Sequence, residues 1–125
     1  MNKKIYYHDT DCGGVVYYAN YLKYLEEGRT EYLNAKGVDI KQLSEQNIVF
    51  VVRRVEVDYK SPARYGDNIL ILSELLNIKR ATIEFAQDIV IDTTLLIRAK
   101  IELVCVNYSF SPKRIPEETI KCLKK

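Results

Sequence analysis

Apolar residues recur with a helical period in one stretch near the start of the chain. Between residues 18 and 36 they lie three, four and seven positions apart, on a face formed by Tyr21, Leu22, Leu25, Gly28, Arg29 and Tyr32. This spacing predicts an amphipathic helix over residues 18–36. Gly37 is placed to end it, since glycine readily adopts the left-handed conformation that follows a helix. Gly28 costs a helix about 1 kcal/mol relative to alanine, and its missing side chain would permit close packing on a sheet.

After residue 50 the apolar positions alternate instead. Stretches with a period of two cover residues 51–59, 68–78, 82–92 and 95–107, and each predicts a long β-strand. The links between these strands are short, so we expect consecutive members of the set to be antiparallel neighbours. The pattern leaves the complete strand order open.

Shorter elements complete the predicted fold. Residues 4–8 predict a first strand, residues 39–45 predict a short helix that Asp39 can cap, and the residues after Pro116 predict a final short helix. One strand, one long helix and four long strands give an α+β fold in which the sheet wraps the helix.

The composition narrows the class of protein. A chain of 125 residues accommodates one domain, residues 1–125, with a single hydrophobic core. Its 47% hydrophobic and 29% charged residues are ordinary for a soluble globular protein and argue against disorder. A net charge of +2 is too small to indicate a protein that coats nucleic acid.

The sequence predicts no metal site, no disulfide bond and no membrane-spanning segment. The three cysteines lack metal-ligand spacing, and His8 is the only histidine. The chain shows no apolar leader and no run of about 18 apolar residues, so we expect a cytoplasmic protein without an integral membrane segment. Peripheral contact with the inner membrane is an alternative that the sequence does not decide. We expect no metal and no bound cofactor.

The candidate chemistry lies between Asp9 and Glu31, where an acidic segment is followed by a glycine turn and the start of the predicted helix. Gly13 and Gly14 allow a sharp turn because each can adopt a positive φ. A helix start presents unpaired N–H groups with partial positive charge, which can stabilise negative charge on a substrate carbonyl oxygen. A nearby aspartate is ionised at neutral pH and can act as a nucleophile or a general base.

Structural roles are the alternative for these residues. Asp11 could cap the turn or the helix by accepting backbone N–H bonds, and Asp9 fits a turn residue better than a second catalyst. The helical residues Glu26, Arg29 and Glu31 fit an ion-pair cluster or a subunit contact.

The segment of residues 5–33, IYYHDTDCGGVVYYANYLKYLEEGRTEYL, resembles the signature of the hotdog-fold thioesterases of the 4-hydroxybenzoyl-CoA thioesterase type. The similarity is greatest to the YbgC-like acyl-CoA thioesterases associated with the Tol-Pal system. Later segments that extend it along nearly the whole chain are FVVRRVEVDYKSPARYGD and the strand ending in LVCVN.

This resemblance implies a five-stranded antiparallel sheet around one long helix, in a homodimer or homotetramer with the site between subunits. It also implies hydrolysis of an acyl-CoA thioester. The family's catalytic aspartate falls on Asp11 rather than Asp9, and its oxyanion contact falls on the backbone N–H of Tyr18. We expect further substrate contacts from Gly14, Val15, Tyr21, Arg54 and Arg80.

The chain departs from the family pattern at several points. Many YbgC-like members have histidine in place of Tyr18, although the backbone N–H survives that exchange. The segment of residues 80–85 is one residue shorter, which bears on the CoA contacts. Some hotdog thioesterases use a helical glutamate, which makes Glu26 the second candidate acid. His8 has no ligand partners and fits a strand residue better than a base, and Cys12 lacks an activating base.

Because CoA carries negatively charged phosphates, we expect positively charged side chains at the mouth of the site. The candidates are Arg53, Arg54, Lys60, Arg64, Lys79, Arg80, Lys113 and Arg114, with Arg54 and Arg80 preferred. The alternative function is a non-catalytic hotdog module that docks an acyl carrier protein or envelope-associated partners. A hotdog dehydratase is a weaker hypothesis, because it would ordinarily need a catalytic histidine.

Overall fold

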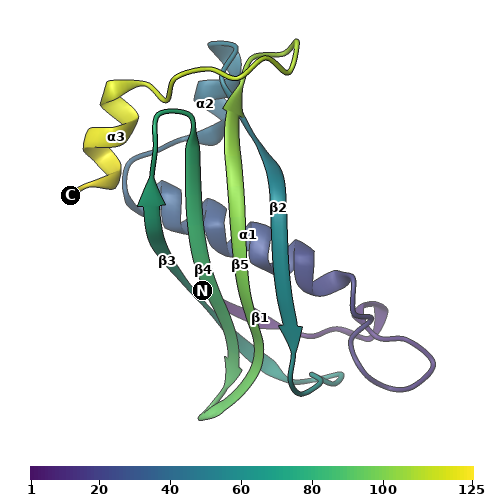
Figure 1. The fold of residues 1–125 in the computed structure, drawn as a ribbon. Helices are drawn as coiled ribbons and strands as arrows, with labels where there is room; N and C mark the ends of the chain where they lie inside the picture. The colour runs from purple at the N-terminus through teal and green to yellow at the C-terminus, as the bar shows by residue number, and fades with distance from the viewer.

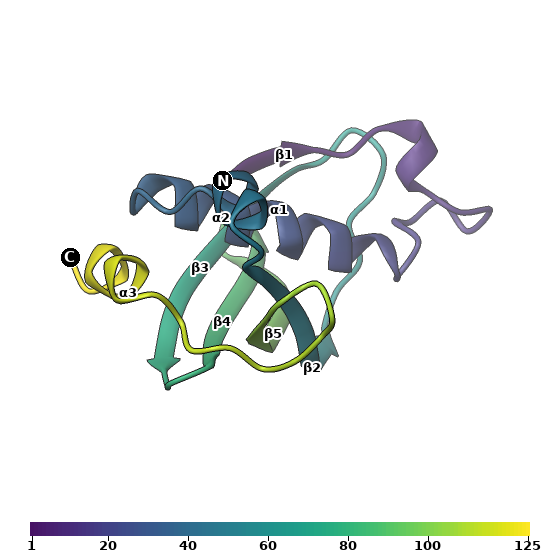
Figure 2. The same ribbon diagram turned by 90° about the horizontal axis from the view of Figure 1, so that it is seen from above.

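A curved five-stranded antiparallel sheet wraps one long helix in the computed structural model, which describes residues 1–125 (Figure 1). In chain order the elements are β1 (Asn2–Lys4), a 3-10 helix (Tyr7–Asp9), α1 (Asn20–Ala35), α2 (Ile40–Glu45), β2 (Val49–Tyr59), β3 (Asn68–Ile78), β4 (Thr82–Ile91), β5 (Thr94–Val106) and α3 (Glu117–Leu123). Across the sheet the strand order is β1-β3-β4-β5-β2. Seen from above, α1 lies across the concave face of the sheet (Figure 2), and the expected α+β fold is confirmed.

Helix α1 follows its predicted range closely, and its buried face holds it against the sheet. The buried residues are Tyr21, Tyr24, Leu25, Gly28, Arg29 and Leu33. Gly28 permits the close approach, because a Cβ atom there would lie 2.5 Å from Ile71 Cγ2 on β3. After the helix the Val38 N–H donates to the Leu33 C=O at 2.8 Å around Gly37, whose φ is +86°. The helix therefore ends where the sequence predicts.

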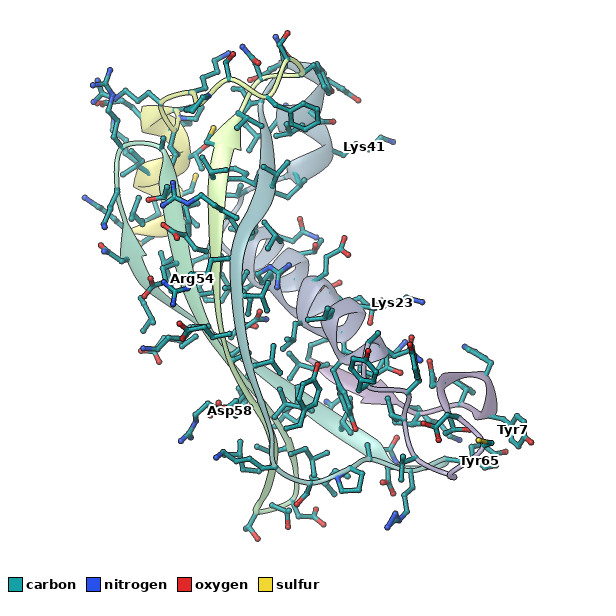
Figure 3. The ribbon with its side chains drawn as sticks, turned by 45° about the vertical axis from the view of Figure 1, so that its right-hand side comes forward. Tyr7, Lys23, Lys41, Arg54, Asp58 and Tyr65 are labelled. Carbon is teal, nitrogen blue, oxygen red and sulfur yellow. The ribbon has the colours of Figure 1, made fainter.

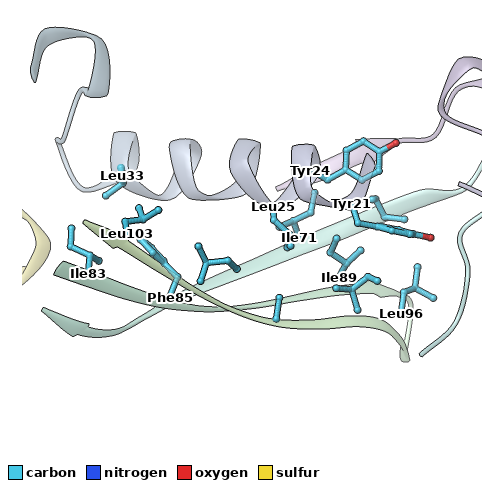
Figure 4. Packing of buried hydrophobic residues seen from close by; sticks show 14 of the residues in the cluster. Tyr21, Tyr24, Leu25, Leu33, Ile71, Ile83, Phe85, Ile89, Leu96 and Leu103 are labelled. Carbon is cyan, nitrogen blue, oxygen red and sulfur yellow. The ribbon is translucent and has the colours of Figure 1, made fainter. Parts of the chain in front are cut away.

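The core fills the space between α1 and the inner face of the sheet (Figure 4). Every second residue of β4 is buried there, namely Ile83, Phe85, Gln87 and Ile89, as expected for a strand with one face toward a core. The ring of Tyr32 on α1 meets Phe85 edge-on, with centroids 5.5 Å apart. Gln87 is a polar exception in this row, and its partners belong to the site described below.

The predicted strand over residues 4–8 is wrong, because the strand lies at Asn2–Lys4 and a 3-10 helix follows it. Local hydrogen bonds compete with the strand ladder in this segment. The Asp9 carboxylate accepts the Tyr6 N–H at 2.8 Å, and the Asp9 N–H donates to the Tyr6 C=O at 3.0 Å. Asp39 behaves as predicted, since its carboxylate accepts two N–H groups at the start of α2.

The predicted neighbourhood of β2 and β3 is also wrong. Strand β2 pairs with β5 at one edge, while β3 lies between β1 and β4. The link of residues 60–67 passes the start of α1, where the Ala63 C=O accepts the Val16 N–H at 2.9 Å and the Ala63 N–H donates to the Tyr21 hydroxyl at 2.9 Å. These contacts replace the hairpin that a short link suggested. The other two links join antiparallel neighbours as predicted.

Strand β2 leaves an unpaired edge along its 11 residues. Its apolar side chains are partly uncovered, with Val52 49% exposed and Val55 40% exposed. A long edge strand with exposed apolar residues is a surface that proteins ordinarily cover. None of the helices combines the length and the apolar character that crossing a bilayer requires.

Candidate active site

Residues 9–17 fold back on themselves as a small hairpin that carries the candidate acid. The Asp11 N–H donates to the Val15 C=O at 2.9 Å, and the Gly14 N–H donates to the Asp11 C=O at 3.0 Å. Gly14 has a φ of +80°, a conformation that favours glycine. Gly13 is not in that conformation, so only one glycine of the predicted turn supplies a positive φ.

The Asp11 carboxylate is exposed at the tip of this hairpin. Its Oδ1 atom accepts the Gly13 N–H at 2.8 Å, and a Cβ atom on residue 13 would lie only 3.1 Å from that oxygen. The second carboxylate oxygen accepts no hydrogen bond within the chain. The turn therefore fixes one oxygen and leaves the other free, which suits both the capping alternative and a reactive group.

The start of α1 offers free backbone donors beside the hairpin. The N–H groups of Tyr18 and Ala19 donate to no acceptor in the chain, whereas the Tyr17 N–H donates to the Asp9 C=O at 3.0 Å. The Tyr18 side chain is 62% exposed, so water and ligands reach this end of the helix. Unpaired N–H groups at a helix start carry partial positive charge and bind anions.

Asp9 is buried beneath the hairpin and holds it in place. Its carboxylate accepts the Tyr6 N–H, and its backbone C=O accepts a hydrogen bond from the Asn20 side-chain amide at 2.9 Å. Burial alone would raise the pKa of the Asp9 carboxyl, but the Tyr6 N–H, the nearby Tyr24 hydroxyl and electrostatic interaction with His8 and Lys3 lower it, and the net direction is down. Burial and the Asp9 carboxylate in turn raise the pKa of Tyr24. This environment fits the turn role expected for Asp9.

Tyrosine rings surround the helix start. The rings of Tyr18 and Tyr59 meet edge-on with centroids 6.1 Å apart, and the Tyr59 hydroxyl donates to the Tyr18 C=O at 3.4 Å. Tyr21, expected as a substrate contact, is 3% exposed, and its hydroxyl accepts the Ala63 N–H. Burial raises the pKa of Tyr21. Tyr21 therefore supports the helix start from beneath, while Tyr18 and Tyr59 present their rings at the surface.

Among the predicted cations, the structure brings Arg64 to the hairpin. Arg64 pairs with Val15 as an antiparallel bridge. The neighbouring Tyr65 ring meets Tyr7 edge-on at 5.8 Å, and both mark this end of the molecule in Figure 3. The sequence did not predict this placement of Arg64, since the bridge depends on the path of the link of residues 60–67.

The two preferred cations lie elsewhere in the chain. Arg54 is exposed on β2, where it pairs with Glu56 away from the hairpin (Figure 3). Arg80 lies in the turn between β3 and β4, at the opposite end of the sheet from the hairpin (Figures 1 and 2). Within one chain no hydrogen bond or ion pair links either side chain to Asp11, and their contacts with CoA stay a prediction.

A groove of about 510 Å³ runs between α1 and β2, and Arg29 lines it. The Arg29 side chain donates to Gln87 Oε1 at 3.0 Å and makes no ion pair, nor do Glu26 and Glu31. The predicted ion-pair cluster is therefore absent. Burial lowers the pKa of Arg29, against the opposing influence of the Glu26 charge. Gln87, the hydrogen-bond partner of Arg29, is 58 residues away in the sequence, so local spacing could not identify this contact.

The remaining candidates are separate side chains. His8 is exposed, stacks on the Tyr6 ring with centroids 5.9 Å apart, and has its Nε2 atom 3.7 Å from Asp9 Oδ1. Cys12 is exposed and unpaired. No three histidine, cysteine or acidic side chains gather as metal ligands would. The exposed carboxylate with a free oxygen and the unused N–H groups of this region therefore lie in the hairpin and at the helix start.

Known proteins share this sequence pattern and this architecture. Residues 6–123 match the thioesterase-like superfamily. The acyl-CoA thioesterase YbgC of Haemophilus influenzae is 38% identical over 117 residues, which cover 92% of this chain and 86% of that protein. The acyl-CoA thioester hydrolase YbgC of Escherichia coli is 36% identical over 119 residues, which cover 94% of this chain and 89% of that protein.

Solved structures extend the similarity to three dimensions. A probable thioesterase from Bartonella henselae has a TM-score of 0.89 and 32% identity, covering 93% of this chain and 97% of its own. A hypothetical protein from Thermus thermophilus has a TM-score of 0.94 at 24% identity, covering 99% of this chain and 95% of its own, and so bears on the fold alone.

Proposed function

The chain belongs to the thioesterase-like superfamily, and from this premise we propose that it is an acyl-CoA thioesterase with Asp11 as its catalytic carboxylate and the Tyr18 N–H as its oxyanion donor. The observation that carries the proposal is the combination described above. An exposed carboxylate with one free oxygen lies in the hairpin that leads directly into a helix start with unused N–H groups.

In the proposed reaction the thioester carbonyl oxygen accepts a hydrogen bond from the Tyr18 N–H. Negative charge that develops on this oxygen is stabilised by donors that are already in place. Asp11 then either attacks the carbonyl carbon and expels CoA thiolate, leaving a mixed anhydride that water cleaves, or takes a proton from a water that attacks instead. Both routes end in a free acid and CoA, and both require an ionised carboxylate.

We extend the proposal to the CoA phosphates. Arg64 is paired with Val15 in the backbone and therefore lies next to the hairpin, and a guanidinium suits the bidentate recognition of phosphate oxygens. Arg54 and Arg80 remain further candidates for phosphate contacts.

A second subunit is part of the proposal. The unpaired edge of β2 has 11 residues and exposes Val52 and Val55, and a second copy of the same strand can hydrogen-bond to it across a two-fold axis. The result would be a homodimer with a continuous sheet. Size-exclusion chromatography with light scattering tests it, and a Val55→Lys variant should shift the mass toward the monomer.

The function is tested with purified protein and a panel of acyl-CoA and acyl-carrier-protein thioesters, by measuring the release of free thiol. Asp11→Asn should lower kcat/KM by about 100-fold or more, since it removes the charged oxygen that either route needs. Near-normal turnover in this variant would contradict the assignment of Asp11. Binding of acyl carrier protein without thiol release would favour the docking alternative.

Two controls sharpen this test. Glu26→Gln removes the second candidate acid and should leave turnover within a few-fold of wild type, whereas a large loss there would move the catalytic role to the helix. Cys12→Ser removes the neighbouring thiol and should likewise preserve turnover. A single turnover in ¹⁸O-water then separates the two routes, because only the anhydride route can leave label in Asp11.

A further inference from the structure

The loop of residues 107–112, which follows β5, presents an exposed aromatic ring on a strained backbone. Phe110 is 72% exposed and has a φ of +60°, a conformation that is rare for a bulky side chain. Such strain persists only where the surrounding structure enforces it, and it concentrates at functional sites. Because most of the ring lies outside the core, packing within one chain does not account for this strain.

Hydrogen bonds within the loop enforce the conformation. The Phe110 N–H donates to the Asn107 C=O at 2.9 Å. The side-chain oxygen of Asn107 accepts the N–H groups of Ser109 and Ser111 at 2.9 and 3.1 Å. The loop therefore holds the Phe110 ring at a fixed place outside the body of the chain.

The loop is fastened to the Val49 end of β2. Val106, directly before the loop, pairs with Val49. The Tyr108 N–H donates to Asn47 Oδ1 at 2.7 Å, and the Tyr108 hydroxyl donates to the Ser44 C=O on α2. Helix α2 lies on the same side of the sheet as α1 (Figure 2). The loop is thus anchored on the side of the sheet that also carries the candidate site.

The candidate site lies at the other end of β2. Tyr59 is the last residue of this strand, and its ring meets that of Tyr18 at the start of α1 with centroids 6.1 Å apart. The 11 residues of β2 span about 33 Å at about 3.3 Å per residue. Phe110 is therefore too far along the sheet to reach the site of its own chain.

Antiparallel pairing of two β2 strands removes this separation. The homodimer proposed above joins the free β2 edges around a two-fold axis, and a pairing that uses all 11 residues sets Val49 of one copy opposite Tyr59 of the other. Neighbouring strands in a sheet are about 4.8 Å apart. A two-fold axis perpendicular to the sheet leaves the helices of both copies on one side. The loop of each copy then lies beside the helix start of the other.

We propose that Phe110 of each subunit completes the candidate site of the other subunit, as an apolar wall beside the Tyr18 N–H. The proposal rests on the proposed function and on the proposed homodimer. In one chain the Tyr18 side chain is 62% exposed and Asp11 is exposed, so water surrounds the groups that would bind and attack the thioester. A ring from the second subunit contacts the acyl chain and excludes water, and donors stabilise a developing oxyanion more strongly where water is excluded.

Photo-crosslinking tests the placement and does not depend on thioesterase activity. Phe110 is replaced by p-benzoylphenylalanine, which keeps an aromatic ring, and dimers are assembled from ¹⁴N-labelled and ¹⁵N-labelled chains. We expect crosslinks from residue 110 of one chain to residues 11–21 or 57–65 of the other. The same replacement at Leu76, which is exposed on β3, is the control and should give no crosslink to these segments. A monomeric protein, or crosslinks from residue 110 that stay within one chain, would overturn the proposal.

Turnover of the single variant tests the contribution of the ring. Phe110→Asn removes the ring and keeps a residue type that tolerates a positive φ. We expect kcat/KM to fall by about tenfold or more, as loss of an aromatic contact with the acyl chain predicts. Leu76→Asn also removes an exposed apolar side chain, from a strand that β4 and β5 separate from β2, and it should leave kcat/KM within a few-fold of wild type.

Mixed dimers then show which chain the ring serves. A heterodimer of an Asp11→Asn chain and a Phe110→Asn chain, purified through two different tags, has one site that contains both Asp11 and a Phe110 ring from the other chain. This heterodimer should regain about half of the wild-type activity, because one of the two symmetric sites is complete. If Phe110 served its own chain, neither site would hold both groups, and activity would stay below that of the Phe110→Asn homodimer.

The two experiments separate this proposal from the proposed function. Interchain crosslinks in a protein that releases no thiol from any thioester would support the placement of Phe110 and contradict the proposed function. Thiol release that depends on Asp11, together with a heterodimer that regains no activity, would overturn the role of Phe110 and leave the proposed function in place.

Discussion

Replacing Gln87 by methionine should destabilise the fold, because the buried Arg29 guanidinium loses its hydrogen-bond acceptor. The substitution keeps the size of the side chain but removes one hydrogen bond from Arg29 and two that Gln87 donates. A bond to a charged group contributes about 1.5–3 kcal/mol and a neutral one about 1 kcal/mol, so the gross loss is about 3.5–5 kcal/mol. The apolar methionine offsets about 1 kcal/mol by burial. We expect a net loss of about 2.5–4 kcal/mol in the free energy of unfolding.

The double variant isolates the cause. In Arg29→Met with Gln87→Met the buried charge and its acceptor disappear together, so the combined loss should be smaller than the sum of the single losses by about 1–3 kcal/mol. The assay is urea unfolding followed by far-UV circular dichroism, at one fixed protein concentration because a dimer would make stability concentration-dependent. Losses that add within about 0.5 kcal/mol would refute the view that Gln87 acts by satisfying Arg29.

Three further predictions test the surroundings of the site. Asp9→Asn should lower the free energy of unfolding by about 1.5–3 kcal/mol at pH 7. Because the folded-state pKa of Asp9 is lowered, wild type loses this stabilisation as pH falls below about 4. Urea unfolding should therefore show a smaller difference in stability between wild type and variant at pH 3 than at pH 7. Gly28→Val should lower stability by about 3 kcal/mol, since its Cβ would lie 2.5 Å from Ile71 Cγ2, and an unchanged Tm would contradict that packing. Burial raises the pKa of the Cys105 thiol whereas Cys12 is exposed, so mass spectrometry should find Cys12 alkylated first in native protein and Cys105 only in denaturant.

The sequence predicts those parts of the fold that depend on local pattern. The period of two gives the bounds of β3 as residues 68–78, and the helical period gives α1 to within two residues at its start and one at its end. The first strand was misplaced because the hydrogen bonds between Asp9 and Tyr6 outweigh the strand propensity of the tyrosines. The neighbours of β2 depend on contacts between distant segments, which periodicity does not contain.

The same division applies to the site. The hairpin that holds Asp11 and the free N–H groups after it follow from adjacent residues, so a short sequence window was enough to propose them together. The surroundings of Arg29 and Arg64 could not be predicted in this way. Gln87 reaches Arg29 across 58 residues, and Arg64 reaches Val15 only because the link of residues 60–67 passes the start of α1.

The pairing of β2 with β5 has a consequence for how the chain is synthesised. The partners are 57 residues apart at Val49 and Val106 and 38 apart at Tyr59 and Ile97. A ribosome must therefore deliver β5 before β2 has any strand to join, and contacts of such sequence separation slow folding. Until then the nascent polypeptide exposes both edges of β2, the condition in which aggregation competes with folding. Slower translation between β2 and β5 should increase the dependence of this protein on chaperones.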